Sequence, residues 1–483
     1  MLPQQMEVGG PAKPPQAGLR VPVASSSRRA QLQRVLGWTF GLAITLGNMF
    51  GTGILTQPGR VAQALGSPLL ILAFWLAGGL FAFFGVLCLL ELAAMFPLEG
   101  GPYVFAQRAF GNGMGFVVGW NDLIGLCAAM AYESYAFASY LNELAGHRLN
   151  VKAIALLLLG LLFALQALGS RHSSQFESAM CIVNALALFV LIASCFVLQR
   201  HSALSYTVPF EPILHRAGFM AVVIALQGVF LTYDGWQSGI YFSEEQKDPN
   251  LTASLKSAMI TGVAIATGLF ILTNLALLKA LPLEVLARSS DLPFPQTAQS
   301  LFGTNGRYVC LALALLVMPP AINAALMLSG RVLFAMSRDH LFWSRAAAVT
   351  SNGSPLVATA LVVTLAGVLI LLKSFDQITE LAVFVFVANY IFSFASLIAF
   401  RTREPHRMRP YKMWGYPWTI AAVLMLALLY LAGALRIHHR NALYALALEL
   451  TAIPVFLLIR RLNRQRGLQA AGPGIASSAG ASD

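Results

Sequence analysis

The stretch that decides the fold runs from Gly47 to Pro58 and reads Gly-Asn-Met-Phe-Gly-Thr-Gly-Ile-Leu-Thr-Gln-Pro. It lies inside the first long apolar segment of the chain, residues 36–64, yet it contains three glycines and several polar side chains. Such a cluster destabilises a continuous helix. At membrane depth, unwound backbone is tolerated only where it is buried in protein or lines a cavity. The stretch therefore predicts a membrane-spanning helix that is broken near its middle.

The composition of the whole chain supports a membrane setting. Of the 483 residues, 57% are hydrophobic and only 11% are charged, whereas soluble globular domains carry roughly 25% charged residues. Apolar runs long enough to cross a hydrocarbon core of about 30 Å recur along the chain. They are too uniformly apolar for the alternating strands of a membrane barrel. We therefore expect an all-α polytopic protein with the lipid bilayer as its surroundings.

Twelve spans are predicted, with short loops between them. They lie near residues 36–64, 69–96, 113–142, 151–169, 177–198, 217–242, 257–281, 307–335, 355–373, 378–400, 416–435 and 442–460. Residues 1–33 and 466–483 are rich in Gly, Pro, Ala and Ser, and we expect both tails to be disordered and cytoplasmic. The core is expected at 34–400, followed by a basic loop and two further spans at 401–465.

The distribution of charge predicts the orientation. With twelve spans, 21 of the 32 Lys and Arg residues fall on the side of the two termini, which the positive-inside rule assigns to the cytoplasm. The net charge of +12 is therefore explained by loops and tails, and nucleic-acid binding is not expected. We expect the plasma membrane or a bacterial inner membrane.

A second break is predicted in the sixth span, where residues 233–239 read Tyr-Asp-Gly-Trp-Gln-Ser-Gly. One glycine pair would indicate only close helix packing. Two matched clusters five spans apart indicate an inverted-repeat transporter with its site near the bilayer midplane.

Four segments carry a resemblance to a known family. Residues 47–58 resemble the Gly-Ser-Gly motif of the amino acid–polyamine–organocation (APC) superfamily, with Thr52 in the serine place. Residues 90–103 are similar to the end of its second span, and residues 323–339 to the end of its eighth span. Tyr233 to Trp236, followed by Glu244 and Glu245, is similar to the sixth span of the L-type amino-acid transporter branch.

This resemblance implies a LeuT-type fold and a function. Two inverted five-helix repeats, expected at 34–200 and 215–400, would be followed by two C-terminal helices. The implied function is secondary transport of amino acids by alternating access, as symport or exchange, and not enzymatic catalysis. No cofactor and no metal site are expected.

The breaks have the chemistry to hold an amino acid. A half-helix that begins inside the membrane presents unpaired N–H groups and a positive dipole end to a carboxylate, and the carbonyls of the unwound segments accept from an ammonium group. No charged side chain is needed at mid-membrane. The predicted substrate-binding residues are Met49, Phe50, Gly51, Thr52, Gly53, Phe230, Leu231, Thr232, Tyr233 and Asp234. Family members often carry an aromatic gate two residues before Tyr233, at Leu231, so Phe230 and Leu231 are both retained.

Three residues are candidates for ion or proton coupling. Asp122 and Glu133 lie eleven residues apart in the third span, about three helical turns, and so near one face. An ionisable group inside a membrane is a functional candidate by default. Many sodium-independent relatives carry a lysine in the fifth span, where this chain has Asn184. Asn184 is left with three alternatives: a cation ligand, a contact to the first span, or an ordinary helix–helix hydrogen bond.

Two other functions are compatible with the sequence, and one kind of partner protein is not expected. Asp122, Glu133 and Asp234 keep open a carrier of polyamines or other organic cations. A non-transporting solute sensor is the alternative of another class. Heavy-chain-linked relatives use a cysteine between the third and fourth spans, and residues 143–151 contain none, so no disulfide-linked heavy chain is expected.

Overall fold

The computed structural model describes residues 37–197, 210–245, 250–289, 292–350, 352–437 and 439–465. The predicted tails, 1–33 and 466–483, lie outside these residues. Throughout the described part the regular secondary structure is helical, which confirms the all-helical prediction.

The helices follow one another with short connections. In chain order they are α1 (Trp38–Met49), α2 (Thr52–Leu65), α3 (Pro68–Met95), α4 (Pro102–Phe110), α5 (Asn112–Leu144), α6 (Val151–Ala167), α7 (Ser170–Val197), α8 (Ile213–Arg216), α9 (Gly218–Tyr233), η2 (Ser238–Glu245), α10 (Leu251–Ala280), α11 (Leu283–Arg288), α12 (Pro293–Arg338), η3 (Ser344–Ala347), α13 (Leu356–Leu372), α14 (Phe375–Arg403), α15 (Trp418–Ile437), α16 (His439–Leu450) and α17 (Ala452–Gln465).

The number of membrane spans is close to the prediction without reproducing it. In the described residues nine helices are long and apolar enough to cross a membrane, and the bent pair of α1 and α2 makes up to ten. Two further apolar helices, α6 and α13, are 17 residues long and are too short for that count. The exact number of twelve stays a prediction.

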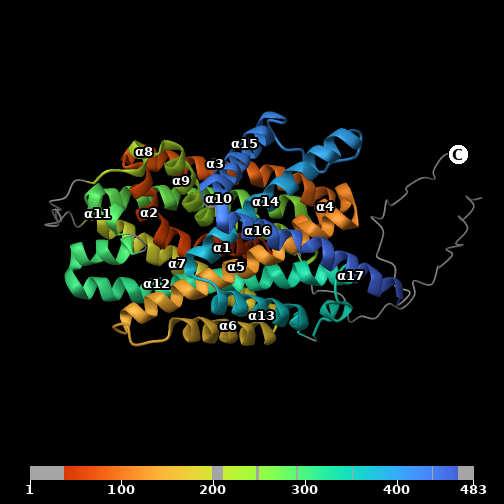
Figure 1. Ribbon diagram of the computed structural model, residues 1–483, viewed down its shortest axis with the longest axis horizontal. Helices are drawn as coiled ribbons and strands as arrows, with labels where there is room; N and C mark the ends of the chain where they lie inside the picture. Colours follow the sequence, from red (N-terminus) through yellow and green to blue (C-terminus); the bar gives the residue numbers. More distant parts are fainter. Residues whose placement is uncertain are drawn as a thin grey trace, which may run out of the picture.

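Helix α5 lies at the centre of the bundle and orders the other helices around it. It packs against α12, α14, α4, α6 and α13, and 83% of its most apolar window is buried, against 28% for α7. Figure 1 shows α5 in the middle, with α6 and α13 together along one side and α15 on the other. The candidate site is built on this central helix.

The periphery of the bundle has the surface that lipid requires. Apolar side chains such as Leu157, Ile182 and Val190 are exposed by 60% or more, which a soluble monomer rarely tolerates over a wide face. All five cysteines are free and buried.

Candidate functional site

The first predicted break is present between α1 and α2. Helix α1 ends at Met49, α2 begins at Thr52, and the two are bent by 40°. The N-cap residue Gly51 offers no side chain to the exposed N–H groups of α2. The bend therefore leaves a helix N-terminus, with its positive dipole end, inside the bundle.

A carboxylate from α5 lies on this N-terminus. The backbone N–H of Thr52 donates to both oxygens of Glu133, at 2.9 and 3.0 Å, and the Thr52 hydroxyl donates to Oε2. The fit is close, because a Cβ on Gly51 would lie 2.3 Å from Glu133 Oε1. Glu133 is 4% exposed. The carboxyl group of Glu133 thus occupies the position where the sequence predicts the carboxylate of an amino acid.

The second predicted break lies between α9 and η2. Helix α9 ends at Tyr233, and a turn over residues 234–237 precedes η2. In this turn Gly235 has a φ of 102°, in the region that favours glycine. Asp234 accepts a hydrogen bond from the hydroxyl of Tyr390 on α14.

The two breaks touch each other. The amide of Asn48, one residue before the end of α1, donates to Ser238 at the start of η2 at 2.9 Å. A Cβ on Gly53 would lie 2.6 Å from the backbone Cα of Thr232. The segment between α1 and α2 and the segment between α9 and η2 therefore form one region of the molecule.

The predicted substrate-binding residues divide into two groups. Gly51, Thr52 and Asp234 lie at the breaks beside polar partners from α5 and α14. Others face neighbouring helices: the ring of Phe230 packs against Phe81 on α3 at 4.7 Å.

Tyr233 and Phe50 also belong to the group of residues whose side chains contact neighbouring helices. The Tyr233 hydroxyl donates to the carbonyl of Trp75 at 2.9 Å, and its ring and that of Phe50 both pack against Phe270 on α10. The hydroxyl of Thr232 donates a hydrogen bond to the carbonyl of Gly228 in the same helix.

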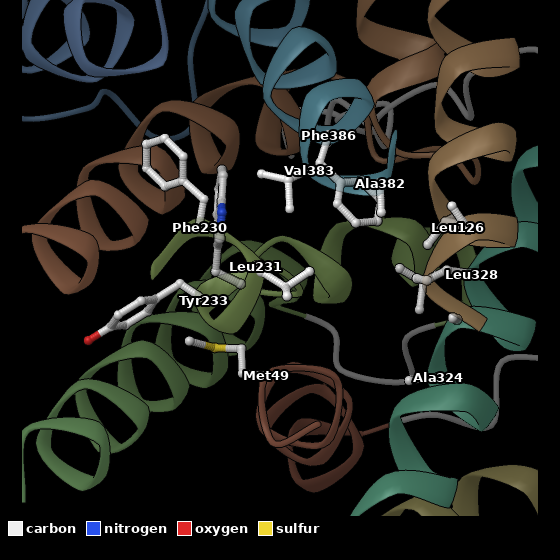
Figure 2. Close-up of a cluster of buried hydrophobic side chains, with 14 of the residues drawn as sticks. Met49, Leu126, Phe230, Leu231, Tyr233, Ala324, Leu328, Ala382, Val383 and Phe386 are labelled. Atoms are coloured by element: carbon white, nitrogen blue, oxygen red, sulfur yellow. The ribbon is translucent and has the colours of Figure 1, made fainter. Parts of the chain in front are cut away.

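The space beside the breaks is lined by aliphatic and aromatic side chains from several helices. Figure 2 shows Leu126 of α5, Leu231 of α9, Leu328 of α12, and Val383 and Phe386 of α14 directed toward a common centre. All are buried. At the two positions considered for a gate, the aliphatic Leu231 therefore faces the centre, while the aromatic Phe230 does not.

Asp122 belongs to a polar cluster nearer the start of α5. Its Oδ1 accepts from the Tyr241 hydroxyl of η2 at 2.9 Å, and its Oδ2 has no hydrogen-bond partner. Both side-chain atoms of the buried Asn389 amide on α14 are also unpartnered. Asp122 thus contacts η2, which follows the second break, and Glu133 contacts α2, which follows the first break.

The third coupling candidate, Asn184, bonds across to α12. Its Nδ2 donates to the carbonyl of Val317 at 3.1 Å, which is the helix–helix alternative, while its Oδ1 has no partner.

Glu177, on the same helix, was missed by sequence reasoning. It lies fully buried against α1, where a Cβ on Gly47 would be 2.0 Å from its Oε1, and its Oε2 accepts from Asn323 of α12 at 2.8 Å. The predicted span began at residue 177, so Glu177 counted as a boundary residue, whereas α7 begins at Ser170.

A group of charged residues that we call the ionic cluster lies at one end of the bundle: Glu99, Glu244, Glu245, Arg331 and Arg338. Arg331 and Glu245 form a buried ion pair at 2.9 Å, each side chain 1% exposed, and Arg338 pairs with Glu244 at 2.8 Å. Glu99 lies in the loop after α3; its backbone N–H donates to the Glu244 carboxylate at 3.0 Å, and the backbone N–H of Glu244 donates to the Glu99 carboxyl at 3.2 Å. Burial raises the pKa of the Glu99 carboxyl well above its ordinary value, and nearby Glu245 raises it further, against the lowering effect of Arg331.

Glu91 anchors the loop after α14 at the same end. It pairs with Arg401 at 2.5 Å and Arg409 at 3.1 Å and accepts from the Met413 backbone at 2.8 Å. This carboxylate is therefore part of the structural frame.

One apolar cavity is bordered in part by Leu55 of α2, three residues after Thr52. It has a volume of about 370 Å³ and lies between α7 and the first half of α12, lined almost wholly by apolar side chains. Among the described residues no group of three His, Cys, Asp or Glu side chains could hold a metal ion.

Comparison with known proteins identifies relatives of the chain. A family model described as amino acid permease matches residues 36–448. The serine/threonine exchanger SteT of Bacillus subtilis is 25% identical over 88% of this chain and 96% of its own. The human large neutral amino acids transporter small subunit 2 is 26% identical over 88% of this chain and 80% of its own. Mouse b(0,+)-type amino acid transporter 1 is 26% identical over 52% of each chain. The matched family, which consists of transporters and not enzymes, covers most of the chain, and the chain belongs to the amino acid permease family, within the APC superfamily that its motifs resemble.

Proposed function

We propose that this protein is a secondary transporter that carries amino acids across the plasma membrane or a bacterial inner membrane by alternating access. The observation that carries the proposal is the contact between Glu133 and Thr52. The N-terminus of α2 holds a carboxylate with its backbone N–H and its first hydroxyl, so the same groups suit the carboxylate of an amino acid. Two relatives named as amino acid transporters and one named as a serine/threonine exchanger support the substrate class.

The remaining parts of an amino acid also find complementary groups. The last carbonyl groups of α1 and α9 have no N–H partner within their helices, because the helices end there. They can therefore accept hydrogen bonds from an ammonium group. The side chains around Leu231 and Val383 are apolar, which favours a neutral amino acid with a small or apolar side chain.

The transport cycle that we propose moves one group of helices against another. Spans 1, 2, 6 and 7 rock against spans 3, 4, 8 and 9 around the fixed site, in a twelve-span protein built from two inverted repeats. The ionic cluster joins the end of span 6 to span 8 and would close one exit. The excess of Lys and Arg on that side supports a cytoplasmic position for this exit and for both termini.

The test is uptake by the purified protein in liposomes. Labelled amino acids are supplied to empty vesicles and to vesicles loaded with unlabelled amino acids, with and without an inward proton gradient. We expect uptake of at least one neutral amino acid. Uptake only into loaded vesicles would establish exchange. Absence of uptake by folded protein that still binds amino acids would favour a sensor.

A second candidate, an organic-cation carrier, is favoured by one observation. Glu133, Asp122, Asp234 and Glu177 are carboxylates in the core, and none takes part in an ion pair in the part of the chain that the structure describes. A polyamine would neutralise several of them. Uptake of putrescine or spermidine without uptake of any amino acid would establish this candidate.

We also propose that the protein works without a disulfide-linked heavy chain. All five cysteines are buried, and the loop between α5 and α6 contains none.

A further inference from the structure

The carboxylate-binding position at the N-terminus of α2 is already filled by the protein itself. Thr52 provides one backbone N–H and one hydroxyl, and both are directed to Glu133. The position has no spare room, since a single added methyl group on Gly51 would overlap Glu133 Oε1 and lie 3.2 Å from Ala321.

An amino acid cannot bind there while Glu133 stays. Two carboxylates on the same two donors would repel each other strongly in a buried site. The carboxylate of the substrate and that of Glu133 therefore exclude each other at Thr52. This step rests on the proposed function, because it requires a substrate that has a carboxylate.

Among the residues that the structure describes, no cationic side chain forms an ion pair with Glu133. The ionisable groups at the breaks include Tyr132, which precedes Glu133 on α5, Asp234 in the second break, Glu177 on α7 and Tyr390 on α14, while Arg307, Arg331 and Arg338 of α12 each pair with another carboxylate. On α2 the nearest is Arg60, which pairs with Asp376, and Ala321 is the contact from α12. A buried carboxylate that loses its hydrogen-bond donors among acidic and phenolic groups is far less costly when it is neutral.

We propose that Glu133 holds the place of the substrate carboxylate in the empty carrier and that each amino acid displaces it as a protonated acid, so that one proton enters with each amino acid. The proton comes from water on the side to which the site is open, and an O–H bond forms on Glu133. The N–H and O–H groups of Thr52 pass from Glu133 to the substrate carboxylate. On the other side the substrate leaves, Glu133 releases the proton to water and returns to Thr52.

The direct test is the number of protons taken up on binding. Purified wild-type protein in detergent is titrated calorimetrically with L-leucine, or with the amino acid that gives the highest uptake in the liposome experiment, in buffers of different ionisation enthalpy. We expect uptake of one proton per substrate at neutral pH. Because each substrate would bind together with one proton, Kd must increase about tenfold per pH unit over the pH range in which Glu133 in the empty carrier is ionised.

Glu133→Gln gives the second arm. The neutral amide cannot take up the proton, so we expect no proton uptake and a Kd that is independent of pH and close to the value of the wild type at low pH. In liposomes this variant should still exchange amino acids but should not accumulate them on an inward proton gradient. Glu449→Gln, which neutralises a carboxylate in α16 far from the breaks, is the matched control and should behave as the wild type.

The outcomes separate this inference from the proposed function. Binding of an amino acid by the wild type without proton uptake overturns the inference and leaves amino acid transport intact. Undiminished proton uptake in Glu133→Gln overturns it as well. Binding of no amino acid by the wild type overturns the proposed function together with the inference. If Glu133→Gln does not fold, the proton count of the wild type still decides.

Discussion

At the residue scale, the site depends on what a single threonine donates. Thr52 takes the place of a serine in the family motif. Its backbone N–H, which is the first of α2, and its hydroxyl both donate to the carboxylate of Glu133. A hydrogen bond to a charged group contributes about 1.5–3 kcal/mol. The hydroxyl of Thr52 is therefore expected to have a measurable share in substrate affinity.

Replacing Thr52 by Val keeps the shape and removes the hydroxyl. We expect substrate affinity to fall by up to about 10-fold, because one charge-assisted hydrogen bond to the substrate is lost while the loss of the same bond to Glu133 in the empty carrier offsets part of the effect. Binding of labelled amino acid to the purified variant measures this. Thr364→Val on α13, whose hydroxyl bonds only its own helix, is the control, and equal affinities in the two variants would contradict the prediction.

Residue by residue, sequence reasoning reached the backbone of the site better than its side-chain contacts. The glycines at 51 and 235 indicated both breaks, because they act through local backbone preference. That Glu133 would reach Thr52, 81 positions earlier in the chain, depends on how α5 packs, which periodicity does not reveal. Glu177 was missed because hydropathy fades gradually at the end of a span.

At the element scale, the fit between α2 and α9 depends on the absence of one side chain. A Cβ at Gly53 would lie 2.6 Å from the backbone of Thr232, and backbone atoms cannot move aside as a flexible side chain can. The two broken helices are therefore held at a distance that only glycine allows.

We predict that Gly53→Ala separates α2 from α9 and destabilises the protein by about 1–3 kcal/mol, the usual cost of overpacking. Thermal unfolding in detergent should show a lower Tm, and liposome uptake should fall. Gly160→Ala on α6, where an added Cβ meets nothing within 4 Å, should leave both unchanged or raise Tm slightly. A normal Tm for Gly53→Ala would show that the contact is adaptable.

The loop between α3 and α4 should make the ionic cluster sensitive to pH. The pKa of Glu99 is raised by burial and by Glu245, so the folded protein keeps its proton at a pH where the unfolded chain has lost it. The associated stability is complete below the ordinary pKa of Glu, about 4.3, and is lost as pH rises toward the raised value.

We therefore expect the Tm of the wild type to fall more steeply with rising pH than that of Glu99→Gln. Thermal unfolding across pH 5–9 measures both slopes. Glu404→Gln, which neutralises a half-exposed carboxylate in a surface pair with Arg407, should keep the slope of the wild type. Parallel slopes for the wild type and Glu99→Gln would contradict the assignment.

At the scale of the whole molecule, the ionic cluster links parts of the chain that are far apart. Residues from the loop after α3, from η2 and from α12 meet there. The all-helical architecture and the two breaks followed from sequence, because they depend on hydropathy and on local helix propensity. The span count of twelve stays a prediction, because it includes α6 and α13, which have only 17 residues each.

Removing one partner of the buried pair should favour the state in which this end is open. In Arg331→Met the carboxylate of Glu245 is left buried and unpaired, at a cost of about 3–5 kcal/mol. We expect a lower Tm and partial recovery in the double variant Arg331→Met/Glu245→Gln. Arg345→Met removes an exposed arginine that lies over Trp343 and should have little effect. Absence of recovery in the double variant would argue against a specific pair.

The burial of every cysteine has a practical consequence for following these motions. Thiol-reactive dyes and spin labels need an accessible thiolate, and each native thiol lies within the helix bundle. A single cysteine introduced on the surface, for example at the exposed Ser344 at the start of η3, can therefore be labelled while the native residues are kept. Pairs of such labels would report distances between the two ends of the molecule through a cycle, in the otherwise unaltered protein.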